Sequence, residues 1–84
     1  MFKVKLNKQP FKFIQKLDKN ISEKILEKLK LLKNNPFHYL EHFEGESYYK
    51  FRIGEYRALI DIDLESKILK IRVLEHRKKI YKKK

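Results

Sequence analysis

At 84 residues the chain is expected to form a single domain, residues 1–84, because a protein of this size buries only about 60% of its unfolded surface and lacks material for a second core. Its 22 Lys and Arg outnumber 11 Asp and Glu, and the formal charge of +11 favours a polyanionic partner, either nucleic acid or an acidic protein. Cysteine and long apolar runs are absent, which excludes disulfides, thiolate metal sites and a membrane-spanning helix and predicts a soluble, unprocessed, cytoplasmic protein.

The first half of the chain predicts one strand and two helices. Residues 2–6, "FKVKL", alternate apolar and lysine side chains as a half-buried strand does. Residues 8–17 and 21–32 repeat apolar residues at helical spacing, and Asn34-Asn35-Pro36 ends the second helix. Because few residues separate them, the two helices should form an antiparallel hairpin that needs an apolar surface to cover.

The second half predicts three strands, residues 48–53, 56–63 and 68–75, joined by the short connections "GE" and "LESK". Such spacing is typical of an antiparallel meander. The order β-α-α-β-β-β therefore predicts an α+β fold in which an N-terminal helical hairpin packs on one face of a twisted antiparallel sheet. The other face of the sheet stays open, and a functional site can lie there.

Period-two alternation divides the strand residues between the two faces. The residues expected toward the helices are Tyr49, Phe51, Ile53, Tyr56, Ala58, Ile60, Ile62, Leu69, Ile71 and Val73. Those expected on the open face are Tyr48, Lys50, Arg52, Arg57, Leu59, Asp61, Lys70, Arg72, Leu74 and His76. Arg57 thus joins other cations on one exposed surface, and the C-terminal Arg77 and Tyr81 can reach its rim.

Cations interleaved with aromatic rings suit an RNA strand, because guanidinium groups bind phosphates bidentately and tyrosine stacks on unpaired bases. Cleavage through the RNA 2′-hydroxyl also requires a base, stabilisation of the phosphorane and an acid. Arginine and lysine supply the stabilisation readily, whereas Lys50 could accept a proton only if its neighbours lowered its pKa. The lysines as a class fit genome composition or heat adaptation equally well, but clustered arginines do not.

The histidines and carboxylates give weaker signals. His38 and His42 are four residues apart in "HYLEH", which favours a solvated helical turn over a zinc site, and His76 either contacts substrate or closes its strand. Asp61 is expected to pair across strands with Arg72 or Lys70. No Gly-rich phosphate loop, catalytic triad or metal-ligand cluster is recognisable, so the sequence predicts neither cofactor nor metal and leaves the basic face as the candidate site.

Two segments, "YYKFRIGEYRALIDID" and "ILKIRVLEHRKKIY", resemble the RelE/ParE superfamily of type II toxins, which carry a tyrosine-basic strand, a G-[DE]-Y-R turn, an acidic hairpin and a closing G-H-R-x-x-x-Y segment. The resemblance covers almost the whole chain and implies the same helix-hairpin-on-sheet fold. It further implies a ribosome-dependent mRNA endonuclease that inhibits translation and is neutralised by an acidic RelB-like antitoxin.

The same resemblance assigns residues to roles. It implies that the catalytic residues are Lys50, Arg52, Arg57, Arg77 and Tyr81. Further RNA contacts are expected from Tyr48, Arg72, His76 and Lys78. Tyr48 stands where paired-lysine members have a second lysine, and Glu75 stands where glycine is common, so the identity of the general base stays open.

Two alternatives to an mRNA endonuclease remain. A ParE-like member would inhibit DNA gyrase by contact and cleave nothing, although such proteins generally lack the arginine-tyrosine ending seen here. A non-catalytic module that binds RNA or the ribosome would carry the same basic face.

Overall fold

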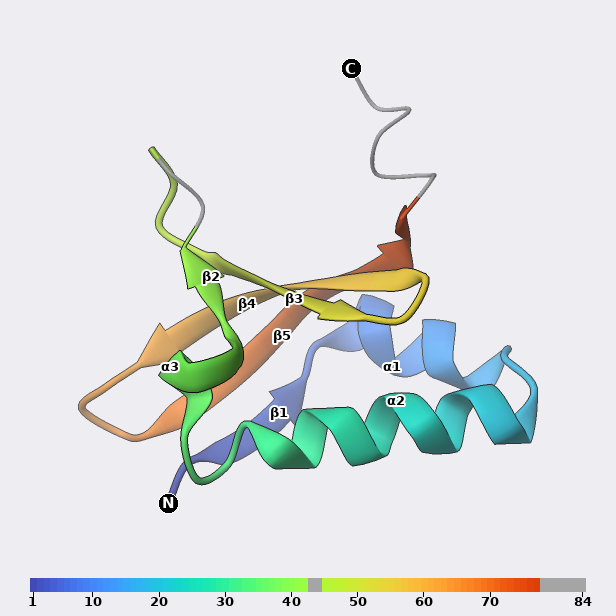
Figure 1. Cartoon of the computed structure of the whole chain (residues 1–84), viewed down its shortest axis with the longest axis horizontal. Helices are drawn as coiled ribbons and strands as arrows, with labels where there is room; N and C mark the ends of the chain where they lie inside the picture. The colour runs from blue at the N-terminus through green and yellow to red at the C-terminus, as the bar shows by residue number, and fades with distance from the viewer. Residues whose placement is uncertain (43–44, 78–84) are drawn as a thin grey trace.

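A helical layer and a five-stranded sheet form two layers in the part of the chain that the computed structural model describes, residues 1–42 and 45–77 (Figure 1). The elements in chain order are β1 (Lys3–Leu6), α1 (Lys8–Gln15), α2 (Lys19–Leu31), α3 (Pro36–Tyr39), β2 (Glu41–His42), β3 (Tyr49–Ile53), β4 (Tyr56–Asp63) and β5 (Ile68–His76). The predicted α+β fold is confirmed. Among the described helices, none combines the length and the apolar character needed to cross a bilayer.

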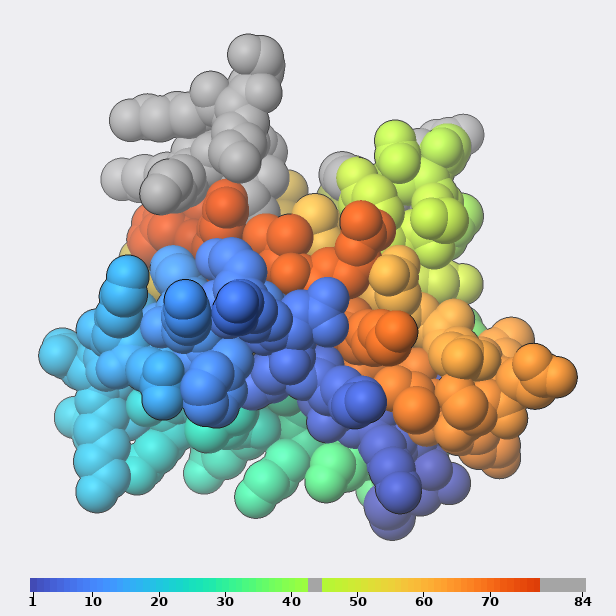
Figure 2. All heavy atoms as spheres, turned by 180° about the vertical axis from the view of Figure 1, so that it is seen from behind, coloured from blue at the N-terminus to red at the C-terminus, as the bar shows by residue number. Residues whose placement is uncertain are grey.

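The sheet has the strand order β1-β5-β4-β3-β2 and is mixed rather than wholly antiparallel. The predicted meander of β3, β4 and β5 is confirmed, but β1 pairs parallel to β5, from Lys3 opposite Ile68 to Leu6 opposite Ile71. Seen from behind, β1 and α1 lie against β5 (Figure 2). The sequence missed β2 and placed the helical turn of α3 too late, at residues 38–42, because two and four residues are too few to show a period.

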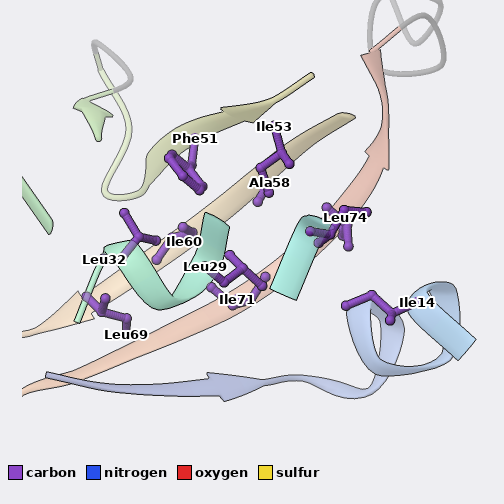
Figure 3. Packing of buried hydrophobic residues seen from close by; sticks show 11 residues of the cluster. Ile14, Leu29, Leu32, Phe51, Ile53, Ala58, Ile60, Leu69, Ile71 and Leu74 are labelled. Carbon is purple, nitrogen blue, oxygen red and sulfur yellow. The ribbon is translucent and has the colours of Figure 1, made fainter. Parts of the chain in front are cut away.

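The core lies between the helices and one face of the sheet (Figure 3). Its buried members are Ile14, Ile25, Leu29, Leu32, Phe51, Ile53, Ala58, Ile60, Leu69, Ile71 and Leu74. The helical stripe predicted for residues 21–32 supplies three of these residues, and full burial of each such side chain stabilises the fold by about 1.5–3 kcal/mol. The helices therefore occupy this face, and no described helix covers the opposite face of the sheet.

A β-bulge at Arg72 changes which side chains of β5 face the core. Leu59 pairs with Val73 and Ile60 with Ile71, so one step along β4 matches two steps along β5. Arg72 is the extra residue of this bulge. As a result Leu74 is buried and Val73 only half-buried. The prediction that Val73 faces the helices while Leu74 and His76 face outward is therefore wrong.

Helix α1 is fastened to β5 immediately after this bulge. The Gln9 side-chain amide donates to the Leu74 carbonyl at 3.0 Å, and the Leu74 amide donates to Gln9 Oε1 at 2.9 Å. Strand β1 ends at the Leu6–Ile71 pair, so Gln9 takes over the hydrogen bonds that a continuing strand would have made. This arrangement satisfies both backbone groups of a buried residue.

Two turns fix the register of the meander. Gly54 has a φ of 57°, which suits the first central position of the two-residue loop between β3 and β4 and aligns Arg52 with Arg57. At the β4–β5 turn, Asp63 Oδ1 accepts hydrogen bonds from the amides of Glu65 at 3.1 Å and Ser66 at 3.2 Å. Hydrogen bonding by the Ser66 side chain, followed by that of the Ser66 and Glu65 amides, lowers the pKa of the Asp63 carboxyl.

Candidate nucleic-acid interface

Arg57 lies in the middle of the uncovered sheet face. It pairs in register with Arg52 on β3 and with Glu75 on β5. The predicted direction of Arg57 is consistent with this register, but the residue is only 7% exposed and the expectation of an exposed side chain is wrong. Together with side chains of β2 and β3, Arg57 lines a hollow in this face.

That hollow is a cavity of about 300 Å³ lined by Glu41, Lys50, Arg52 and Arg57. Three strands contribute to it: β2, β3 and β4. Glu41 and Lys50 are register partners, and their side chains approach to 3.8 Å between Oε1 and Nζ. Three cations in a partly enclosed space are suited to hold a phosphate group, because charge attraction is stronger away from bulk water and guanidinium groups bind phosphate through paired hydrogen bonds. We call this space the Arg57 cavity.

The basic face continues past the Arg57 cavity toward Tyr48 and Arg72. The guanidinium carbon of Arg72 lies 5.4 Å from the centre of the Tyr48 ring, a cation–π distance. Arg72 Nε also lies 3.4 Å from Asp61 Oδ2, which confirms the predicted cross-strand pairing. Both partners of that ion pair are substantially exposed, so it contributes little stability and serves mainly to orient the guanidinium beside the ring.

Arg77 directly follows β5 at the far end of the same sheet. Its amide donates to the Glu55 carbonyl at 2.8 Å, which holds the chain against the β3–β4 turn. The residue is half-buried, and its Nε is enclosed without a hydrogen-bond partner among the described residues. Arg77 does not line the Arg57 cavity. Lys78 and Tyr81, predicted to bind RNA and to stack on a base, lie outside the described residues.

His76 lies on the helix-facing side of the sheet, opposite to its expected position. Its register partner is Tyr56, and the two rings are 5.3 Å apart. His76 Nε2 is 3.1 Å from Glu55 Oε1, so the ring links the end of β5 to the β3–β4 turn. These contacts favour the strand-closing role, and a contact of His76 with RNA stays a prediction.

The other two histidines do not share a helical turn. His38 belongs to α3 and its ring lies 4.8 Å from that of Tyr39, whereas His42 belongs to β2 and lies 4.9 Å from the Tyr49 ring. The helical turn expected for "HYLEH" therefore ends at Tyr39. Within the described part of the chain, no three His, Asp or Glu side chains gather as a metal-binding set.

Sequence reasoning missed the acidic residues of this face. Glu41 reaches the Arg57 cavity because the two residues of β2 pair with β3, and no period in the sequence indicates so short a strand. Glu75 shares the row of Arg57 because of the bulge, which simple alternation does not anticipate. A carboxylate seven residues before the β-rich run that begins at Tyr48 is a weak signal, and it would have been the available one for Glu41.

Comparison with known proteins agrees with this geometry. Residues 4–81 match the family model described as the ParE toxin of the type II toxin–antitoxin system parDE. No curated protein sequence matches the chain significantly.

Several solved structures share the fold. RelE in the archaeal RelE–RelB complex of Pyrococcus horikoshii OT3 is 29% identical with a TM-score of 0.78, over 90% of this chain and 94% of that one. The RelBE2 toxin–antitoxin complex of Mycobacterium tuberculosis contains a chain that is 24% identical with a TM-score of 0.79, over 90% and 98% of the two chains. The isolated Escherichia coli RelE toxin is 16% identical with a TM-score of 0.77, over 98% and 93%.

The family model spans nearly the whole chain, and the RelE structures reproduce its arrangement of helical hairpin and sheet. The resemblance that the strand and turn motifs carry is thereby confirmed. The chain belongs to the ParE toxin family of type II toxin–antitoxin systems, within the RelE/ParE superfamily.

Proposed function

We propose that this toxin is a ribosome-dependent endoribonuclease that cuts mRNA in the cytoplasm and so inhibits translation. The observation that carries the proposal is the Arg57 cavity, where a nearly buried guanidinium and two further cations converge. Preorganised cations aimed at developing charge are the main requirement for stabilising a pentavalent phosphorane, and they act most strongly where water is partly excluded.

In this proposal Arg57 holds the scissile phosphate through two hydrogen bonds, and Lys50 and Arg52 stabilise the additional charge of the transition state. Arg77 stabilises the leaving 5′-oxygen from the end of β5. Tyr81 stacks on a base, while Tyr48 and Arg72 extend the path of the RNA along the open face. Lys78 adds a phosphate contact whose effect depends on salt.

The ribosome enters the proposal because a site built chiefly from cations gives little control over the direction of attack. In-line attack by the 2′-hydroxyl needs a particular backbone geometry, and holding that geometry can supply a large part of the rate. An mRNA held in the decoding site of the ribosome would already have the backbone geometry that in-line attack needs.

The test uses purified toxin with programmed ribosomes, with naked mRNA and with DNA gyrase in parallel. RNA ends are mapped by primer extension, and gyrase is assayed by supercoiling. We expect discrete cuts in ribosome-bound message, little cleavage of naked RNA and unchanged supercoiling. Efficient, unselective cutting of naked RNA would contradict the need for the ribosome.

Gyrase inhibition is the second candidate function, because the family model that matches is that of ParE toxins. Loss of supercoiling without any RNA cut in this assay would establish it instead.

We also propose an acidic RelB-like antitoxin as the natural partner, since the P. horikoshii and M. tuberculosis relatives are toxin–antitoxin complexes. Two apolar grooves flank α2. One, of about 430 Å³, is lined by β1 and α2 and includes Val4 and Leu26. The other, of about 590 Å³, lies between α2 and the β3–β4 turn and includes Leu31, Ile53 and the cations Lys24 and Lys28. An amphipathic acidic segment fits such cation-rimmed grooves.

Leu31→Glu is expected to weaken antitoxin binding by about 10–100-fold, because it replaces roughly 1.5–3 kcal/mol of apolar burial with a charge that repels an acidic partner. Leu31 is 44% exposed in the free protein, so the fold should tolerate the change. Leu64→Glu is the matched control, since Leu64 is 63% exposed and lines neither groove. Calorimetric titration with a RelB-type antitoxin measures both variants, and equal affinities would exclude this groove as its docking site.

A further inference from the structure

Among the described residues that line the Arg57 cavity, Glu41 places a carboxylate beside the cations. We propose that Glu41 is the general base that removes the proton from the attacking 2′-hydroxyl. This inference rests on the RNA cleavage proposed above and names a catalytic residue for it. It assigns to Glu41 the step for which the sequence offered only Lys50.

The position of Glu41 is fixed by strand pairing. Cross-strand partners project from the same face of a sheet, so the pairing of Glu41 with Lys50 directs the carboxylate to the open face and into the cavity lining. Arg57 is 7% exposed and lies at the bottom of the cavity, whereas the Glu41 side chain is 76% exposed and lies at its opening. A phosphate bound on Arg57 would therefore hold the adjoining ribose toward Glu41.

Among the described residues that line the cavity, the chemistry leaves Glu41 as the proton acceptor. Arg52 and Arg57 carry guanidinium groups, which stay protonated in proteins. Lys50 lies in an ion pair with Glu41, and an ammonium has no lone pair to accept a proton. A carboxylate has such lone pairs, and the neighbouring ammonium can fix its direction while the second oxygen faces the substrate.

In the proposed step the 2′-O–H bond breaks and its proton passes to a Glu41 oxygen while the 2′-oxygen forms a bond to phosphorus. The bond between phosphorus and the 5′-oxygen then breaks, and the leaving oxygen, stabilised by Arg77, takes a proton from solvent water. The products are a 2′,3′-cyclic phosphate and a 5′-hydroxyl, and Glu41 returns its proton to solvent.

Other titratable and charged groups surround Glu41. His42 is its neighbour on β2, Lys50 and Arg52 face it from β3, and Arg57 faces it from β4. Glu75 on β5 is the rival base, because it pairs in register with Arg57 on the same face. Glu75 does not line the cavity, and this is the reason for preferring Glu41.

The test measures single-turnover cleavage of ribosome-bound mRNA by the full-length protein. Glu41→Gln keeps the shape of an exposed side chain and should lower the rate by about 10²–10⁴-fold. Glu75→Gln is the matched control and should cleave at a rate within about tenfold of wild type.

An mRNA whose scissile 5′-oxygen is replaced by sulfur distinguishes loss of the general base from loss of leaving-group stabilisation. A thiolate is a good leaving group and needs no stabilisation by the protein. Glu41→Gln should stay slow on this substrate, whereas Arg77→Ala should recover. In a Lys50→Met background Glu41→Gln should still slow cleavage, which a role limited to orienting Lys50 would not cause.

If wild-type protein cleaves, three results would overturn the inference alone. Glu41→Gln could cleave within a few-fold of the wild-type rate, or it could regain the wild-type rate on the sulfur substrate. In the Lys50→Met background, Glu41→Gln could also leave the cleavage rate unchanged. A loss of rate in Glu75→Gln as large as that expected for Glu41→Gln would overturn it too. Failure of wild-type protein to cut any ribosome-bound message would overturn the proposed function, and the inference with it.

Discussion

Arg57→Met is expected to lower single-turnover cleavage of ribosome-bound mRNA by about 10²–10³-fold, the usual loss when one preorganised donor to a developing negative charge is removed. Arg57 is the nearly buried cation of the cavity, so its charge is less screened than that of the exposed lysines. Methionine retains an unbranched apolar side chain and fills the space of the arginine stem, which alanine would leave empty.

Two comparisons isolate the role of the guanidinium. Arg57→Lys keeps a charge but loses the planar fork, and it should recover only part of the rate if bidentate contact matters. Lys70→Met removes an exposed cation of β5 outside the cavity and should cleave within a few-fold of wild type. Cleavage by Arg57→Met within a few-fold of wild type, with an unchanged melting temperature, would remove Arg57 from the site.

Leu74→Ala is expected to reduce the free energy of unfolding by about 2–5 kcal/mol, because Leu74 is fully buried and alanine leaves a cavity in the core. A small domain has roughly 5–15 kcal/mol in total, so this single change removes a large fraction of its stability. Urea denaturation followed by circular dichroism measures the loss.

Val73→Ala is the matched comparison for Leu74→Ala. Simple alternation along β5 places Val73 in the core and Leu74 outside, whereas the bulge at Arg72 gives the reverse. We therefore expect Val73→Ala to cost about 1 kcal/mol or less, since Val73 is only half-buried. A larger loss for Val73→Ala than for Leu74→Ala would contradict the bulge.

The sequence predicted the elements whose apolar periods are long. The stripe of Ile25, Leu29 and Leu32 and the alternation through Phe51 and Ile53 determined which face the helices cover, and both are confirmed. The register of the β3–β4 hairpin could also be predicted from the sequence, because the two-residue loop at Gly54 allows few alternative strand pairings.

What the sequence could not predict depends on contacts between distant segments. A bulge inserts one residue without any local signal, so the faces of Leu74 and His76 were assigned wrongly. The parallel pairing of β1 with β5 depends on which sheet edge the chain reaches after the helices. The entry of Glu41 into the Arg57 cavity depends on β2, a strand of two residues.

The most direct test of the central claim, that this toxin cuts RNA through the 2′-hydroxyl at the Arg57 cavity, uses a message with a single 2′-deoxy nucleotide at the mapped cut position. The message is bound to programmed ribosomes, and mass spectrometry identifies the released ends. We predict that wild-type toxin cuts the all-ribose message to give a 2′,3′-cyclic phosphate and a 5′-hydroxyl, and leaves the 2′-deoxy message intact at that position. Equal cutting of both messages at the same position, or no cutting of either, would contradict the account.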